Sequence, residues 1–212
     1  DTPIRARKEV QLLLTYIEAL HSVGQSGLGS LEEKQLIEKC FVLCSRFDKL
    51  YFRVLWYHWF HHYCASTAAY LPEMPLIPQA LIDIARNNQD SPDMAMIAYL
   101  AVLKESERAG MNGYNLVDFV ERGLDIYCQF TDDDIEKFGF KYGQMDYGVH
   151  FLCHGLRVCW MMGKNLLFLS YVTKGLTMLR RVNHHPSCLH FLANCCCLLY
   201  YRREFRLMHN IA

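Results

Sequence analysis

The sequence predicts an all-α fold, arranged as an array of helical hairpins that forms an α-solenoid or a bundle. Three observations predict it. Apolar residues recur with the period of a helix along most of the chain, and no convincing strand alternation is found. Most of the six prolines lie between these periodic segments. Short turns join about nine expected helices, as in hairpin arrays, although no clean repeat consensus is present.

The length and the charge balance set the first limits on organisation and function. With 212 residues, we expect a single domain over 1–212, and a chain of this size buries roughly 70% of its unfolded surface. The sequence starts without a methionine, so we expect it to be part of a longer protein. Lysine plus arginine and aspartate plus glutamate number 22 each. A nucleic-acid contact would therefore need a local basic patch.

The first two helices are predicted from their starts. Pro3 suits the first turn of a helix that extends to about Ser22. Ser30 and Glu33 form a capping box, in which the hydroxyl accepts from a free backbone amide and the carboxylate reaches back. We expect one long helix to follow, over 31–63.

The middle of the chain is divided by proline and glycine signals. We expect an extended connector over 71–78, because proline disfavours helix in the residue before it. Helices are expected next over 79–87, 91–110 and 115–130, where the serine and the asparagine at the start of the last two are caps.

The last third also begins with a cap. Thr131 and Asp134 form a second capping box, which explains the acidic run 132–134 better than a magnesium site does. Gly139, Gly143 and Gly148 indicate a looser passage. Three further helices are expected over 149–162, 165–181 and 186–209.

The stretch LWYHWFHHYC, over 55–64, is the most unusual part of the sequence. His58 and His62 have the i, i+4 spacing that can place two imidazoles on one metal. No acidic residue lies nearby, and the helix is apolar nearly all round, which favours a buried core helix. We interpret its histidines as hydrogen-bonded core residues, with a metal site or base stacking as the alternatives.

Two further groups contain metal-ligand residue types. In the first, His150, Cys153 and His154 share one helix face and are interpreted as part of a core stripe rather than a zinc site. In the second, His184 and Cys188 have ligand-like spacing, with Cys195 as a third candidate. This segment resembles the His-x3-Cys-x4-Cys pattern of a herpesvirus family of zinc-binding post-transcriptional regulators, although six residues separate the two cysteines here. A zinc-binding helical regulatory protein is therefore an alternative function.

The cysteines and the apolar runs indicate a compartment. Most of the ten cysteines lie within apolar helical patterns, so we expect reduced thiols in a nuclear or cytoplasmic protein rather than disulfides in a secreted one. No apolar run reaches the roughly 20 residues of a membrane helix, and no secretory signal precedes the first charges.

Two basic segments are candidates for nucleic-acid contact. Arg180 and Arg181 precede two histidines, and Arg202, Arg203 and Arg206 follow two tyrosines. Arginine beside tyrosine suits phosphate contact with base stacking. It also suits a protein interface, and cations are typical of a solvated helix end as well.

The order of three segments resembles the Sac/GANP helical domain, which is related to the PCI proteins. They are LIEKC (36–40), PDMAMIAYLAVL (92–103) and FLANCCCLLYYRREFRLMHNIA (191–212). The resemblance covers most of the chain, although the family's arginine-rich opening motif is only weakly represented at 5–8 and its winged-helix module is absent.

The resemblance implies a non-catalytic scaffold of a nuclear mRNA-export or mRNA-processing assembly. It implies pairing with a second helical or PCI-type subunit and a composite RNA-binding surface, for which Arg202, Arg203 and Arg206 would be the contacts. No enzyme signature is found, and no cofactor is expected unless zinc is bound. A protein–protein adaptor of another pathway remains the other alternative.

Overall fold

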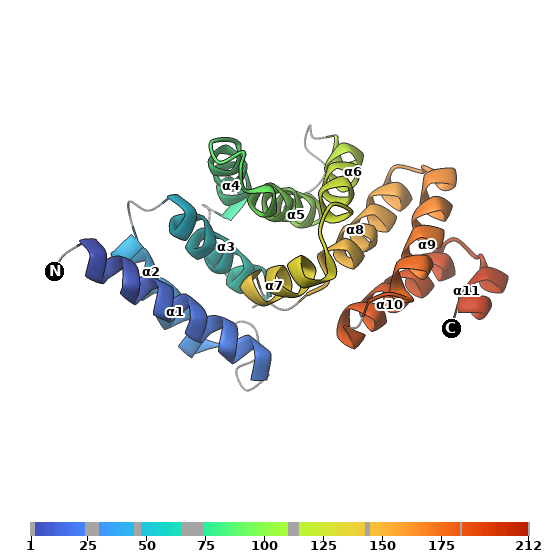
Figure 1. Ribbon diagram of the computed structural model, residues 1–212. Coiled ribbons are helices and arrows are strands. Elements are labelled where there is room, and N and C mark those ends of the chain that lie inside the picture. The colour runs from blue at the N-terminus through green and yellow to red at the C-terminus, as the bar shows by residue number, and fades with distance from the viewer. Residues whose placement is uncertain are drawn as a thin grey trace. The chain divides into compact units, whose positions relative to one another are not determined.

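The structure is a computed structural model that describes residues 3–23, 30–44, 48–64, 74–109, 115–142, 145–182 and 184–211. These residues contain eleven α-helices, one short 3-10 turn (Met74–Leu76) and no strand (Figure 1). The all-α prediction is confirmed, with more helices than the nine expected. The helices are α1 (Pro3–Val23), α2 (Leu31–Cys44), α3 (Asp48–Cys64), α4 (Ile77–Arg86), α5 (Pro92–Ala109), α6 (Leu116–Tyr127), α7 (Asp132–Tyr142), α8 (Tyr147–Met161), α9 (Asn165–Leu179), α10 (His185–Tyr201) and α11 (Phe205–Ile211).

The helices gather into two compact units. Unit 1 comprises Asp1–Glu105 and Glu136–Gln144, and unit 2 comprises Ser106–Ile135 and Met145–Ala212. Each unit has its own buried apolar core. A single domain over 1–212 and a solenoid arrangement both stay predictions.

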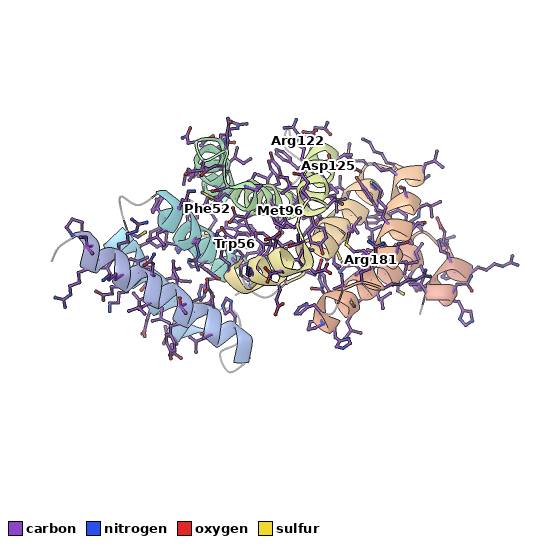
Figure 2. All side chains as sticks on the ribbon, viewed as in Figure 1. Phe52, Trp56, Met96, Arg122, Asp125 and Arg181 are labelled. Carbon is purple, nitrogen blue, oxygen red and sulfur yellow. The ribbon has the colours of Figure 1, made fainter. Side chains whose placement is uncertain are left out.

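The core of unit 1 is built around α3. Helix α1 packs against α2, α2 against α3, and α3 against α4. Phe52, Trp56 and Trp59 of α3 are fully buried, as is Met96 of α5 (Figure 2 labels three of these four residues). Because each large apolar side chain contributes roughly 1.5–3 kcal/mol when buried, the aromatic residues of α3 contribute substantially to the stability of this unit. The interpretation of LWYHWFHHYC as a core helix is confirmed.

The prediction of one long helix over 31–63 is wrong. The segment forms α2 and α3, which end and begin on either side of 45–47, a stretch outside the described residues, and pack against each other. The sequence between them contains neither proline nor glycine. The reversal therefore follows from burial of the apolar faces of both helices against one another rather than from a local helix breaker.

The core of unit 2 is built around α8, which contacts α6, α9 and α10. Four glycines of the unit allow aromatic rings to approach the helix backbones closely: Gly123, Gly148, Gly155 and Gly175. A Cβ on Gly175 would lie 2.0 Å from Cζ of Phe191, and one on Gly148 would lie 2.5 Å from Cε1 of Tyr127. Gly148 thus belongs to α8, and Gly139 to α7, rather than to the looser passage expected there. Gly143, the third of these glycines, lies outside the described residues.

The predicted caps agree with the structure only in part, because Asn115 precedes α6 but its side chain makes no capping hydrogen bond. The Thr131 hydroxyl accepts from the backbone N–H of Asp134 at 3.2 Å, and the Asp134 carboxylate accepts from the backbone N–H of Thr131 at 3.1 Å. Ser30 likewise accepts from the N–H of Glu33 at 3.2 Å. The expected connector over 71–78 ends earlier than predicted, because Ile77 and Pro78 already form the first turn of α4, where proline is tolerated.

The expected helix over 186–209 is also two helices. Helix α10 ends at Tyr201 and α11 begins at Phe205. Between them Arg203 has a left-handed backbone with φ of 60°. Such a residue ends an α-helix and turns the chain. The break determines where the C-terminal arginines point.

Candidate interaction surface

The turn between α10 and α11 is a Schellman motif with arginine in place of the usual glycine. The backbone N–H of Arg203 donates to the carbonyl of Tyr200 at 2.9 Å, and that of Glu204 donates to the carbonyl of Leu199 at 3.0 Å. These two bonds satisfy the last carbonyls of α10 and fix the left-handed Arg203 between them. The main chain of the turn is therefore held on both sides of Arg203.

Arg202 points toward the start of α9 rather than into solvent. Its Nη1 donates to Oδ1 of Asn165 at 2.6 Å, and its guanidinium lies 4.5 Å from the centre of the Phe168 ring. Glu204 accepts from its Nε at 2.8 Å and from its Nη2 at 2.6 Å. Arg202 therefore joins the end of α10 to the start of α9, and of the predicted C-terminal trio only Arg203 and Arg206 are exposed.

A chain of exposed aromatic rings lies beside this turn. The ring centres of Trp160 and Tyr201 are 6.1 Å apart, those of Tyr201 and Tyr200 are 5.9 Å apart, and those of Tyr200 and Phe205 are 5.9 Å apart. The exposed fractions are 43% for Trp160, 63% for Tyr201 and 52% for Phe205. Large apolar side chains that remain this exposed and this close together are typical of interaction sites.

We call this region the aromatic–basic surface. It comprises Trp160, Tyr200, Tyr201, Arg203, Phe205 and Arg206. The ends of α8 and α10 and the beginning of α11 supply it. Met161 and Met162, which follow Trp160, and Leu166, which follows Asn165, are also exposed.

The other two predicted basic residues lie away from this surface. Arg180 and Arg181 are exposed and follow the C-terminal end of α9, where Figure 2 labels Arg181. Arg202, in contrast, contacts the first residues of α9. Because α9 has 15 residues and a helix rises 1.5 Å per residue, its ends are about 20 Å apart. The five arginines predicted for nucleic-acid contact therefore fall into two groups.

The three candidate zinc ligands have other roles in the structure. Nδ1 of His184 accepts from the backbone N–H of Ser187 at 3.3 Å and caps α10. Cys188 lies 3.9 Å from the carbonyl of Val182. Cys195 is fully buried, and this burial raises its pKa to about 12. In the part of the chain that is described, no group of three or more His, Cys, Asp or Glu side chains could hold a metal ion, which gives the zinc alternative no support.

Unit 2 contains a partly buried polar network that the sequence analysis did not predict. Glu107 accepts from Nη1 of Arg157 at 2.7 Å and lies 2.5 Å from Nδ1 of His154, while Nε of Arg157 donates to Asn194 at 2.9 Å. Burial alone would raise the pKa of Glu107, but His154 and Arg157 together hold it below its usual value. The network joins the end of α5 to α8 and α10. Its members are far apart in sequence, so no local pattern could identify it.

Unit 1 contains a buried polar cluster centred on Glu33. Glu33 of α2 is only 1% exposed, and its two carboxylate oxygens lie 2.9 Å from Nε2 of His21 and 3.1 Å from Nδ1 of His61. One carboxylate thus joins α1, α2 and α3. The expected role of His61 as a hydrogen-bonded core residue is confirmed.

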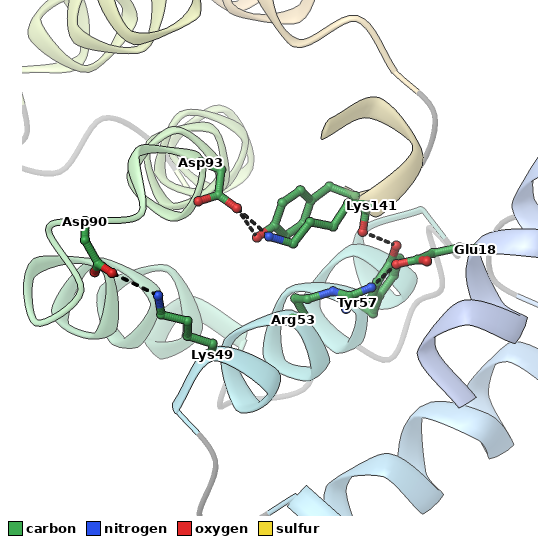
Figure 3. A network of polar contacts seen from close by, with 8 residues as sticks. Glu18, Lys49, Arg53, Tyr57, Asp90, Asp93 and Lys141 are labelled. Carbon is green, nitrogen blue, oxygen red and sulfur yellow. Dashed lines mark hydrogen bonds and ion pairs between the residues drawn. The ribbon is translucent and has the colours of Figure 1, made fainter. Parts of the chain in front are cut away.

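Further ion pairs link other helices of unit 1 (Figure 3). Arg53 donates to the buried carboxylate of Glu18, and burial still raises the pKa of Glu18 despite this partner. Lys141 of α7 donates to Asp93 of α5 at 2.6 Å, and its carbonyl accepts from the hydroxyl of Tyr57 at 2.8 Å. Each of these charged groups has a partner on another helix, so the ion pairs cross-link the helices of unit 1.

The buried thiols have low reactivity. All ten cysteines are free, which confirms the prediction of unpaired thiols. Burial raises the pKa of Cys40 to about 12 and those of Cys44 and Cys159 to about 11. A thiol with such a pKa is almost entirely protonated at neutral pH and is a poor nucleophile. Cys128 and Cys197 are the two exposed thiols.

Comparisons with known proteins add no assignment. No protein-family model, no curated protein and no solved structure matches the chain significantly. The Sac/GANP resemblance therefore stays a prediction that depends on the motifs alone. Within the described ranges, no helix combines the length and the apolar character needed to cross a membrane.

Proposed function

We propose that this chain is a non-catalytic interaction scaffold that binds a protein partner through the aromatic–basic surface. The observation that carries the proposal is the row of exposed rings from Trp160 through Tyr201 and Tyr200 to Phe205. Trp, Tyr and Arg are the residue types that contribute most to binding at protein interfaces. The Sac/GANP resemblance suggests that the assembly handles mRNA in the nucleus, with a second helical or PCI-type subunit as the partner.

RNA contact at this surface is the second candidate function, and it would depend on Arg203 and Arg206. Both are exposed and follow Tyr200 and Tyr201 closely in the sequence, so a phosphate contact and base stacking could occur together. Arg202 is excluded from this role because Asn165, Phe168 and Glu204 already surround its guanidinium. The free thiols suit a reducing compartment, nuclear or cytoplasmic.

The test is affinity purification of the tagged chain from its native cells, with partners identified by mass spectrometry. We expect Tyr201→Ala with Phe205→Ala to lose partners that the wild type retains. Arg180→Ala with Arg181→Ala is the matched control, because these exposed residues lie at the other end of α9. An unchanged set of partners in the Tyr201/Phe205 variant, with its helix content intact, would refute the assignment of the surface.

RNA contact at the aromatic–basic surface needs a separate measurement. Binding of purified chain to single-stranded RNA is titrated against salt, because each phosphate contact adds to the salt dependence. We expect Arg203→Ala with Arg206→Ala to weaken binding and to reduce the slope, whereas Arg202→Ala should act mainly through stability. Equal affinity and slope in the Arg203/Arg206 variant and the wild type would reject RNA contact at this surface.

A further inference from the structure

We infer that the aromatic–basic surface binds an acidic peptide segment of a partner protein, one that also carries bulky apolar side chains. The inference rests on the proposed function and deepens it, because it states the chemistry of the partner. It depends on three properties: the positive charge of 202–211, the exposed apolar side chains that follow Trp160 in the sequence, and the rigidity of the turn that supports the surface.

The positive charge is not balanced locally. Over 202–211 the sequence has three arginines and one glutamate. Glu204, the only acid there, is bound by Arg202 through two hydrogen bonds. This leaves Arg203 and Arg206 exposed without an acidic neighbour in that segment, and Lys164 is exposed next to Asn165. An acidic partner complements such a surface, whereas a basic partner would be repelled.

The aliphatic side chains favour a peptide over a nucleic acid. Leu166 is 85% exposed, and Met161 and Met162 are also exposed close to the rings in the sequence. Bases stack on aromatic rings and on arginine, and they gain little from leucine or methionine. Apolar side chains of a peptide can bury all of these residues, and methionine adapts readily to differently shaped partners. The rings of Tyr200 and Tyr201 also meet edge to face at 71°, rather than lying parallel as a continuous stacking platform.

The surface is held in place before any partner binds. The Schellman motif fixes the turn at Arg203, and Arg202 ties the turn to Asn165 and Phe168 of α9. A rigid site loses less conformational entropy on binding than a flexible one. A short peptide segment can therefore bind usefully here without a large interface.

The experiment uses the full chain and a displayed library of random peptides as the probe. Peptides enriched on immobilised wild-type chain are sequenced, synthesised with a fluorophore and measured by anisotropy over a range of salt concentrations. We expect enriched peptides to combine aspartate or glutamate with Phe, Leu, Met or Trp, and to bind more weakly as salt increases.

Variants of the chain test the location. Tyr201→Ala should weaken binding about tenfold or more, as expected for an interface anchor. Arg203→Gly with Arg206→Glu should do the same, because glycine suits the left-handed backbone at 203 and the pair then differs mainly in charge. Arg180→Glu with Arg181→Glu makes a larger charge change at the other end of α9 and should leave binding unchanged.

Three results would overturn the inference. The first is enrichment of neutral or basic peptides, or of no peptide above background. The second is equal binding of the peptides by the wild-type chain and by the Tyr201 and Arg203/Arg206 variants. The third is displacement of the peptides by oligouridine RNA or phosphatidylserine vesicles that bind the same surface more tightly. If the library gives one of these results while the surface variants still lose native partners on purification, only the partner chemistry is wrong and the scaffold function stands.

Discussion

Substitution of Gly175 by alanine should destabilise the protein even though alanine is the better helix former. Gly175 lies within α9, and a Cβ there would be 2.0 Å from Cζ, 2.4 Å from Cε2 and 2.7 Å from Cε1 of Phe191. Ordinary contact begins at 3.4 Å, so the ring would have to move by about 1.4 Å. Phe191 is fully buried and packed on all sides, so it has little room to move.

The magnitude follows from two opposing contributions. Alanine gains about 1 kcal/mol over glycine in a helix interior. Overpacking a closed core costs about 1–3 kcal/mol, and the short contact with three ring atoms places this site at the upper end. We therefore expect Gly175→Ala to lower the free energy of unfolding by about 2 kcal/mol. The change should be measured by urea unfolding, followed by circular dichroism.

A double-mutant cycle makes this prediction sharper. The three atoms in the way are Cζ, Cε1 and Cε2 of Phe191, and leucine lacks all of them. Phe191→Leu leaves a cavity and is itself destabilising. In that background, however, Gly175→Ala should stabilise the protein by about 1 kcal/mol, because only the helix preference remains. A destabilisation of equal size in both backgrounds, or a stabilising effect with Phe191 in place, would refute the packing described for α9 and α10.

Three other predictions concern charge, thiol reactivity and capping. Glu107→Gln should cost about 1–3 kcal/mol at neutral pH. Because the pKa of Glu107 is lowered in the folded state, its contribution is complete above its unfolded pKa and is lost as the pH falls through its folded pKa. The difference between wild type and variant in urea midpoint should therefore shrink toward low pH, and a constant difference would contradict the ion pairs. Iodoacetamide should label Cys128 and Cys197 in the native protein and leave Cys40 and Cys195 unlabelled by peptide mass spectrometry, whereas early labelling of Cys40 would contradict its burial. Thr131→Ala should lower the free energy of unfolding by about 1 kcal/mol through loss of the cap of α7, and thermal unfolding unchanged from wild type would argue against that cap.

The sequence predicted the presence of helices better than their ends. Helix periodicity and the Thr131–Asp134 capping box are local signals, and both agree with the structure. The sequence between α2 and α3 contains no proline or glycine that would indicate the end of a helix. The break after α10 has an arginine at the position where glycine would have indicated a turn. In the first case tertiary packing determines the boundary. In the second, the Schellman bonds hold an arginine in a left-handed conformation that its residue type does not predict, so periodicity reveals neither break.

The candidate surface was predictable only in part. Arginines and tyrosines adjacent in the sequence indicated a basic and aromatic segment, and that segment supplies most of the surface. The contribution of Trp160 could not be predicted, because the end of α8 reaches Tyr201 only through the packing of unit 2. The inward direction of Arg202 was hidden for the same reason, since Asn165 and Phe168 lie more than thirty residues earlier.

Glu33 has a consequence for how unit 1 could be shortened or regulated. A chain cut between α1 and α2 would lose His21, so the buried Glu33 carboxylate would lose its contact with α1 while it keeps His61 of α3. Removal of one member of a buried charge cluster costs far more than the cluster contributes as a whole. Loss of α1 by proteolysis or dissociation should therefore destabilise α3, so that the rest of unit 1 unfolds rather than remaining as a smaller stable fragment.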